Sequence, residues 1–194
     1  MASPAPTPPT SVPWKRWFLP TLAITAALDL ATKSWVFARH HEGERFHAWG
    51  ETAYNSGVAW GLFGDYPLAV LALTVVLIPV LTVVWWRQFR REGAAANLAF
   101  GLILGGAVGN GYDRVMMGLH QHARMGDAPR PWPGFPGVRD FIRIDLNPIG
   151  IDYIWPNFNV ADAAISVGFV LLVGLMLFAT GPSPSRPTLD RAST

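Results

Sequence analysis

The residues most able to do chemistry are polar side chains that interrupt long apolar segments of the sequence. In chain order they are Asp29, Lys33, Asn110, Asp113, Arg114, Asn159 and Asp162. A charged group within a membrane costs about 3 kcal/mol or more, so it is rarely kept without an ion pair or a function. An ion pair would explain why Asp29 and Lys33 occur in an apolar run, since they lie four residues apart on one helix face. It would also explain Asp113 beside Arg114, whereas Asp162 has no basic residue in its own apolar segment and is the clearest candidate for chemistry.

Acid–base chemistry by carboxylates is what remains when other mechanisms are tested against the sequence. The chain has no cysteine, no Gly-x-Ser-x-Gly turn, no His-Glu-x-x-His helix and no phosphate-binding glycine loop. His40 and His41 could ligate a metal, but adjacent histidines in a polar loop are more commonly solvated, and we expect no metal or organic cofactor.

Two aspartates that share one proton can activate water and protonate a leaving amine, because two nearby carboxylates cannot both ionise. These considerations nominate Asp162 as one member of such a pair. They leave its partner open among four other aspartates, namely Asp29, Asp113, Asp140 and Asp145.

Four apolar runs must position these residues, and they predict an all-α membrane protein. The runs cover residues 17–37, 66–86, 94–117 and 160–180, each near the roughly 20 residues that a helix needs to cross a bilayer. The composition agrees, with 51% hydrophobic and 14% charged residues and a mean hydropathy of +0.25. The first run follows basic residues, as a cleaved signal would, but it contains Asp29 and Lys33 and lacks a convincing cleavage site. We therefore expect four retained transmembrane helices.

The remaining segments predict one domain with two tails and a small outer sheet. Residues 1–13 and 182–194 have the composition of disordered tails, which leaves residues 14–181 as a single membrane domain. Short alternating apolar pieces occur in the two long loops, of which Val138–Ile144 is the best, and predict a small β-sheet on the outer face.

The basic residues that flank the runs predict the orientation in the membrane. They are Lys15, Arg16, Arg87, Arg90, Arg91, Arg186 and Arg191, all on one side of a four-span protein. Basic flanks stay cytoplasmic, so both termini are expected inside and both long loops outside. On this topology the polar side chains gather near the outer ends of the helices. The net charge of +2, without a basic stripe, gives no reason to expect nucleic-acid binding.

Small residues in the third run predict the packing seam of the bundle. Gly101, Gly105 and Gly109 recur every four residues, a spacing that lets helices approach closely in lipid. Gly106 and Gly111 lie off this stripe and are interpreted as positions where the backbone could approach a substrate.

Five motifs, in order along the chain, resemble those of the lipoprotein signal peptidase (signal peptidase II) family. They follow the family patterns Asp-x-x-Thr-Lys, Asn-x-Gly-x-Ala-Phe-Gly, Gly-Gly-Ala-x-Gly-Asn-x-x-Asp-Arg, Val-x-Asp-Phe and Phe-Asn-x-Ala-Asp-x-Ala-Ile. In this sequence they occupy Asp29–Lys33, Asn55–Gly61, Gly105–Arg114, Val138–Phe141 and Phe158–Ile165. The resemblance covers all four predicted spans.

The resemblance implies an aspartic endopeptidase of the bacterial cytoplasmic membrane, with Asp140 and Asp162 as catalytic carboxylates. It implies a prolipoprotein substrate cleaved just before a diacylglyceryl cysteine, with membrane lipids as surroundings and globomycin-like peptide antibiotics as inhibitors. The residues implied to support catalysis or grip the substrate are Asp29, Lys33, Asn55, Gly57, Asn110, Asp113, Arg114, Asn159 and Ala161.

Two departures from the family pattern are visible. Trp60 stands where the family usually has phenylalanine. Residues 119–137 form an insertion rich in proline and arginine, interpreted as an outer arm outside the catalytic machinery.

Two other functions stay open from the sequence. A non-catalytic relative could bind lipidated peptides, and a small transporter could use buried acids as a relay. The transporter would carry polar residues at the midplane and on both sides, whereas those found here gather at one end.

Overall fold

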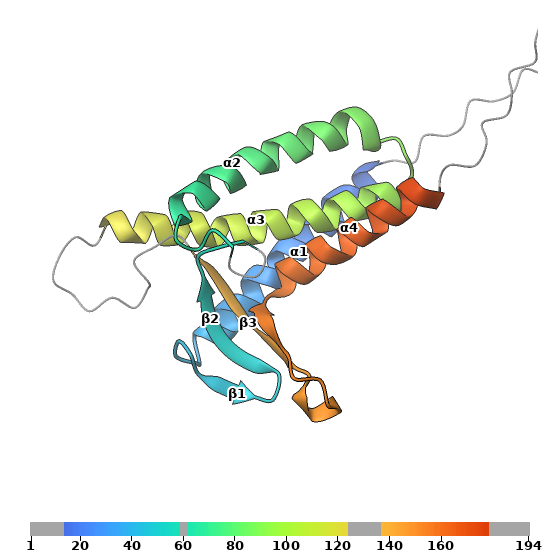
Figure 1. Ribbon diagram of the computed structural model, residues 1–194. Helices are drawn as coiled ribbons and strands as arrows, with labels where there is room; N and C mark the ends of the chain where they lie inside the picture. Colours follow the sequence, from blue (N-terminus) through green and yellow to red (C-terminus); the bar gives the residue numbers. More distant parts are fainter. Residues whose placement is uncertain (1–13, 59–61, 124–136, 179–194) are drawn as a thin grey trace, which may run out of the picture.

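Four long helices form from the apolar runs of the sequence. The structure, a computed structural model, describes residues 14–58, 62–123 and 137–178 (Figure 1). Its helices are α1 (Trp14–Phe37), α2 (Pro67–Val84), α3 (Ala94–Ala123) and α4 (Val160–Phe178). α2 continues into one π-helical turn, η2 (Trp85–Phe89). In the described residues, Pro67–Phe89, Ala94–Met116 and Val160–Phe178 are each long and apolar enough to cross a membrane.

The described helix boundaries lie within three residues of the predicted runs except at the end of the third. α3 continues six residues past the predicted end at Met117, so the first five residues of the predicted arm, 119–123, are helical. These residues can continue the helix because the first proline of the insertion, the residue type that breaks helices, is Pro129. Residues 124–136 of the arm, and the Ala59–Gly61 part of the second motif, lie outside the described residues.

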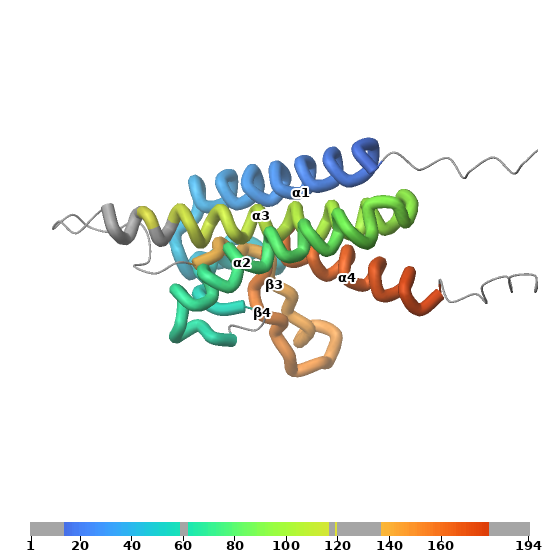
Figure 2. The backbone as a smooth tube through the Cα atoms, turned by 90° about the horizontal axis from the view of Figure 1, so that it is seen from above, coloured from blue at the N-terminus to red at the C-terminus, as the bar shows by residue number. Residues whose placement is uncertain are grey.

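The glycine stripe of α3 packs against α1, as predicted. α1 runs alongside α3 in both views (Figures 1 and 2). A Cβ atom added at Gly105 would lie 2.7 Å from Thr25 Cβ and 2.8 Å from Leu22 O, and one at Gly109 would clash with the Asp29 carboxylate. Only glycine therefore permits this approach of the two backbones.

Two other glycines in α3 also pack against helices, and the interpretation that they face substrate is wrong for Gly106, which meets the backbone of α4. A Cβ atom on Gly106 would lie 2.5 Å from Ala161 O of α4. One on Gly111 would lie 3.2 Å from the Ile78 side chain of α2. α3 is thus the central helix, with a neighbour on each of three faces.

A four-stranded antiparallel sheet lies near one end of the bundle, which confirms the predicted sheet. Its strands, in spatial order, are β1 (Arg45–His47), β2 (Gly50–Asn55), β3 (Val138–Asp145) and β4 (Ile154–Phe158). A short 3-10 turn, η3 (Asn147–Ile149), lies between β3 and β4. β4 runs directly into α4, so the sheet and the start of α4 are placed together.

Candidate active site

Asp162 is fixed by a reciprocal cap at the start of α4. Asn159 immediately precedes the helix, and its Oδ1 accepts a hydrogen bond from the Asp162 backbone N–H at 3.0 Å. In return, the Asn159 backbone N–H donates to Asp162 Oδ2 at 3.1 Å. This pattern is a capping box, in which two otherwise unpaired N–H groups at a helix start are satisfied. Local sequence around the β4–α4 junction therefore determines where this carboxylate lies.

The same asparagine connects Asp162 to Asp140. Asn159 Nδ2 donates to Asp140 Oδ1 at 2.6 Å and to Asn110 Oδ1 at 3.2 Å. Asp140 lies in β3, opposite Ala53 of β2, and only 1% of its surface is exposed. The fully buried Asn159 side chain thus contacts Asp140 in the sheet and also caps α4, the helix that carries Asp162.

Burial changes the acidity of Asp140. Removal from water raises the pKa of this carboxyl from 3.8 to about 7, and the negative charge of Asp162 contributes in the same direction. Hydrogen bonds from Asn159 and Asn55 oppose the rise in pKa but are smaller effects. Asp140 can therefore carry a proton near neutral pH, as a general acid must.

A buried lysine supports the opposite side of Asp162. Lys33 Nζ lies 2.7 Å from Asp29 Oδ2 and donates to Asn110 Oδ1 at 2.8 Å. With its oxygen occupied by this lysine, Asn110 presents Nδ2 to Asp162 Oδ1 at 2.8 Å. Asp29 also accepts from the Ala161 backbone N–H at 2.9 Å, which ties α1 to the first turn of α4.

Asp113 forms an ion pair with Arg139, which was not predicted from the sequence. Arg139 Nη2 donates to Asp113 Oδ1 at 2.7 Å, and the Arg139 backbone N–H donates to Asp113 Oδ2 at 3.1 Å. Lys33 Nζ lies 3.4 Å from the same carboxylate. Asp113 therefore anchors β3 one residue before Asp140, and the expected pairing of Asp113 with its neighbour Arg114 is not found. The sequence feature that could have predicted this ion pair is the charged residue Arg139 at the variable position of the Val-x-Asp-Phe motif.

Arg114 instead contacts the loop after β2. Its Nη2 donates to the backbone oxygen of Gly57, whose own N–H donates to Asn55 Oδ1 at 2.9 Å. Arg114 Nε is buried and has no hydrogen-bond partner among the described residues. This guanidinium therefore holds the loop and retains a donor for another group.

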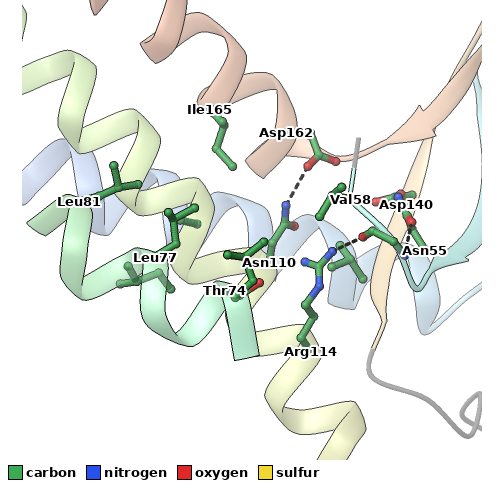
Figure 3. A pocket seen from close by; sticks show the side chains of 15 residues that line it. Asn55, Val58, Thr74, Leu77, Leu81, Asn110, Arg114, Asp140, Asp162 and Ile165 are labelled. Atoms are coloured by element: carbon green, nitrogen blue, oxygen red, sulfur yellow. Dashed lines mark hydrogen bonds between the residues drawn. The ribbon is translucent and has the colours of Figure 1, made fainter. Parts of the chain in front are cut away.

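The two aspartates line one cavity between α2, α3, α4 and the sheet (Figure 3). It encloses about 210 Å³. Its polar end is formed by Asn55, Asn110, Arg114, Asp140 and Asp162, and its apolar wall by Leu73, Leu77, Ile78, Leu81 and Ile165. The arrangement suits a chain segment that presents one polar bond to carboxylates and apolar groups to helices.

The three other candidate aspartates, Asp29, Asp113 and Asp145, do not line this cavity. Asp29 and Asp113 are occupied by Lys33 and Arg139 within the helix bundle. Asp145 lies at the far end of β3, where it is partly exposed and 3.6 Å from Arg143. Of the four alternatives that the residue types left open, Asp140 is the one that lines a cavity together with Asp162 and accepts a hydrogen bond from Asn159.

Comparison with known proteins shows what the chain resembles. The family model described as Signal peptidase (SPase) II matches residues 21–178. The lipoprotein signal peptidase of Aquifex aeolicus (strain VF5) is 33% identical over 175 residues, covering 86% of this chain and 89% of that protein. The one of Xylella fastidiosa (strain M12) is 34% identical over 181 residues, covering 88% and 93%.

A solved structure shares the fold. It is a bacterial membrane enzyme determined by the in meso method at 2.3 Å resolution, with a TM-score of 0.66 and 22% identity. The match covers 88% of this chain and 95% of that one.

Proposed function

The chain belongs to the signal peptidase II family, a family of proteases that remove signal peptides from prolipoproteins, and we propose that Asp140 and Asp162 are its catalytic pair. The observation that carries this proposal is the bridge made by Asn159, which caps α4 at Asp162 and donates to Asp140. Both carboxylates line one cavity, as a shared water and a scissile bond would require. The reaction is hydrolysis of a peptide bond by an aspartic endopeptidase.

In the proposed reaction, Asp162 is the general base and Asp140 the general acid. Two donors, Asn110 Nδ2 and the Asn159 N–H, face the Asp162 oxygens, an arrangement suited to an ionised carboxylate. Burial favours the protonated form of Asp140, which donates a hydrogen bond to the scissile carbonyl oxygen. Water attacks the carbonyl carbon and transfers a proton to Asp162. As the C–N bond breaks, a proton passes to the leaving nitrogen, giving a carboxylate and a free amine.

The supporting residues divide into two roles in this proposal. Asp29, Lys33 and Asn110 orient Asp162 from inside the bundle, and the Ala161 N–H is part of the same link. Arg114, Gly57 and Asn55 form the loop side of the cavity, where the free Arg114 Nε is available to a substrate carbonyl.

The substrate is proposed to be a prolipoprotein whose cysteine already carries diacylglycerol, cut just before that cysteine. The apolar wall of the cavity and the lipid-facing helices suit its apolar segments. A globomycin-like peptide would compete for the same cavity.

We infer that α1 is a fourth transmembrane span and that the active site faces the outside of the bacterial cytoplasmic membrane. The charged residues deep in α1, Asp29 and Lys33, are fully buried against α3 and α4 and do not meet lipid. Basic residues lie at the end of the bundle away from the sheet, the end that stays cytoplasmic. A reporter fused to the C-terminus should be active only if it is one that works in the cytoplasm.

Cleavage of a synthetic diacylated prolipopeptide by the purified protein in detergent tests the function. Asp140→Asn and Asp162→Asn should each abolish cleavage while the protein stays folded, and Asp145→Asn should retain it. Lipopeptide binding without turnover by the unaltered protein would favour the non-catalytic alternative. Normal turnover by Asp140→Asn would show that the pair is misassigned.

A further inference from the structure

The connection between α2 and α3 lies at the end of the bundle away from the sheet (Figure 1). Its side chains form a cationic hollow. We name it the arginine hollow. It is lined by Trp86, Arg87, Gln88, Arg90, Arg91 and Glu92 and encloses about 420 Å³. Three cations thus surround one acid, and within the described part of the chain none of the three arginines forms a salt bridge.

The backbone that carries these arginines is fixed by a buried asparagine. Asn97, which is fully buried in α3, accepts a hydrogen bond from Trp85 Nε1 at 3.0 Å. Its Nδ2 donates to the backbone oxygens of Arg90 at 3.2 Å and Gly93 at 2.6 Å. Trp85 itself stacks on Phe18 of α1, with ring centroids 3.5 Å apart. The backbone that carries the arginines is therefore held in place by contacts with α1 and α3.

A π-helical turn contains or directly precedes the arginines that line the arginine hollow. The Arg90 N–H bonds to Trp85 O at 2.9 Å, a wider turn than in an α-helix. Such single π turns occur often at functional sites. Because Gly93 adopts φ +98°, the chain then reverses sharply into α3. The side chains of this turn are left around the hollow with no role in the cavity of the aspartates.

The surface leading to the hollow is apolar. Val80 and Val83 at the end of α2 are 49% and 51% exposed, and Trp86 of η2 is 44% exposed, so acyl chains would contact them in a membrane. The Arg90 guanidinium lies 4.0 Å from the centroid of the Trp86 ring, where the apolar and cationic surfaces meet. Tryptophan is enriched at the interface between a bilayer and water. The guanidinium group of arginine can bind two oxygens of one phosphate through two parallel hydrogen bonds.

We propose that the arginine hollow binds the phosphate of an anionic phospholipid of the inner leaflet, with the acyl chains lying along α2. α1 adds positive charge beside it, since Trp14 contacts Trp86 at 5.5 Å between ring centroids and Lys15 and Arg16 follow directly. A free phosphate ion would match the arginines but not the adjoining apolar face. The site is separate from the aspartates, so an inactive Asp140→Asn variant should retain it.

The test measures lipid binding by the delipidated full-length protein in detergent. Phosphatidylglycerol, phosphatidylcholine and inorganic phosphate are titrated separately, with native mass spectrometry and melting temperature as readouts. We expect phosphatidylglycerol to bind and to raise the melting temperature, and neither other probe to do so. The triple variant Arg87→Gln, Arg90→Gln, Arg91→Gln should bind phosphatidylglycerol at least tenfold more weakly.

Arg39→Gln is the matched control, because Arg39 also stacks on an exposed tryptophan, Trp35 at 4.8 Å, but lies at the other end of α1. It should bind phosphatidylglycerol as the unaltered protein does. If the triple variant unfolds, phosphatidylglycerol binding is measured instead for the single Arg91→Gln variant and for the unaltered protein at 1 M salt. Binding should be weaker in both measurements. Equal binding by the variant and the unaltered protein would overturn the proposal. Equal stabilisation by inorganic phosphate would also overturn it, in favour of a soluble anion.

Discussion

Replacing Asp140 with asparagine should stabilise the folded protein at alkaline pH although it removes activity. The pKa of this carboxyl rises from 3.8 to about 7 because folding buries it beside Asp162. Between pH 3.8 and pH 7 the folded protein therefore keeps a proton on Asp140 that the unfolded chain has lost. The free energy of unfolding then falls as the pH rises through this range. Asparagine carries no charge, and its side-chain oxygen can still accept the hydrogen bond from Asn159.

The magnitude follows from the same two values. Each pKa unit corresponds to about 1.4 kcal/mol, so ionised Asp140 costs the folded protein up to about 4 kcal/mol above pH 7. Of this cost, about 3 kcal/mol arises between pH 4.5 and pH 8.5. The advantage of Asp140→Asn over the unaltered protein should therefore grow by about that amount across this range.

The assay is thermal unfolding of the purified full-length protein in detergent at pH 4.5 and pH 8.5. Asp145→Asn is the control, since hydrogen bonds from Asn147 lower the pKa of Asp145 and ionisation there favours the folded state. That variant should gain no stability at pH 8.5. If the advantage of Asp140→Asn were the same at both pH values, Asp140 would not be protonated near neutral pH, and its assignment as the general acid would be refuted.

Four further outcomes are expected. The kcat/KM of cleavage should fall as the pH rises past about 7, because the aspartate pair then loses its shared proton; a flat profile from pH 6 to 9 would contradict this. Arg139→Met should lower kcat far more than it raises KM and destabilise the protein by about 3 kcal/mol, since it leaves Asp113 short of a buried partner, whereas Arg139→Lys should restore part of both. Gly106→Ala should lower both activity and melting temperature because its Cβ would press on the first turn of α4, while Gly174→Ala, with nothing within 4 Å, should change neither. Replacing residues 124–136 with a short linker should raise KM and leave kcat nearly unchanged; a collapse of kcat in the folded variant would show that this segment orients the catalytic strand.

The four long helices could be predicted from the sequence, because each apolar run is long enough to be recognised by composition alone. The glycine stripe of α3 was equally readable, since a four-residue repeat of residues without Cβ has one main use between membrane helices. Asp162 was also nominated from its residue type and position. Its capping partner Asn159 lies only three residues away, so this part of the site is local information.

The proposed partner of Asp162 could not be predicted from residue types, because it depends on contacts between segments that are far apart in the chain. Asp140 and Asp162 come from a strand and a helix, and their approach depends on β3 pairing with β4, on the β4–α4 junction and on Asn159. Tertiary packing also assigned Asp113 to Arg139 rather than to its sequence neighbour Arg114, because adjacent residues on a helix point in different directions. Composition along a chain determines which segments leave water, whereas the pairing of buried charges depends on contacts between segments far apart in that chain.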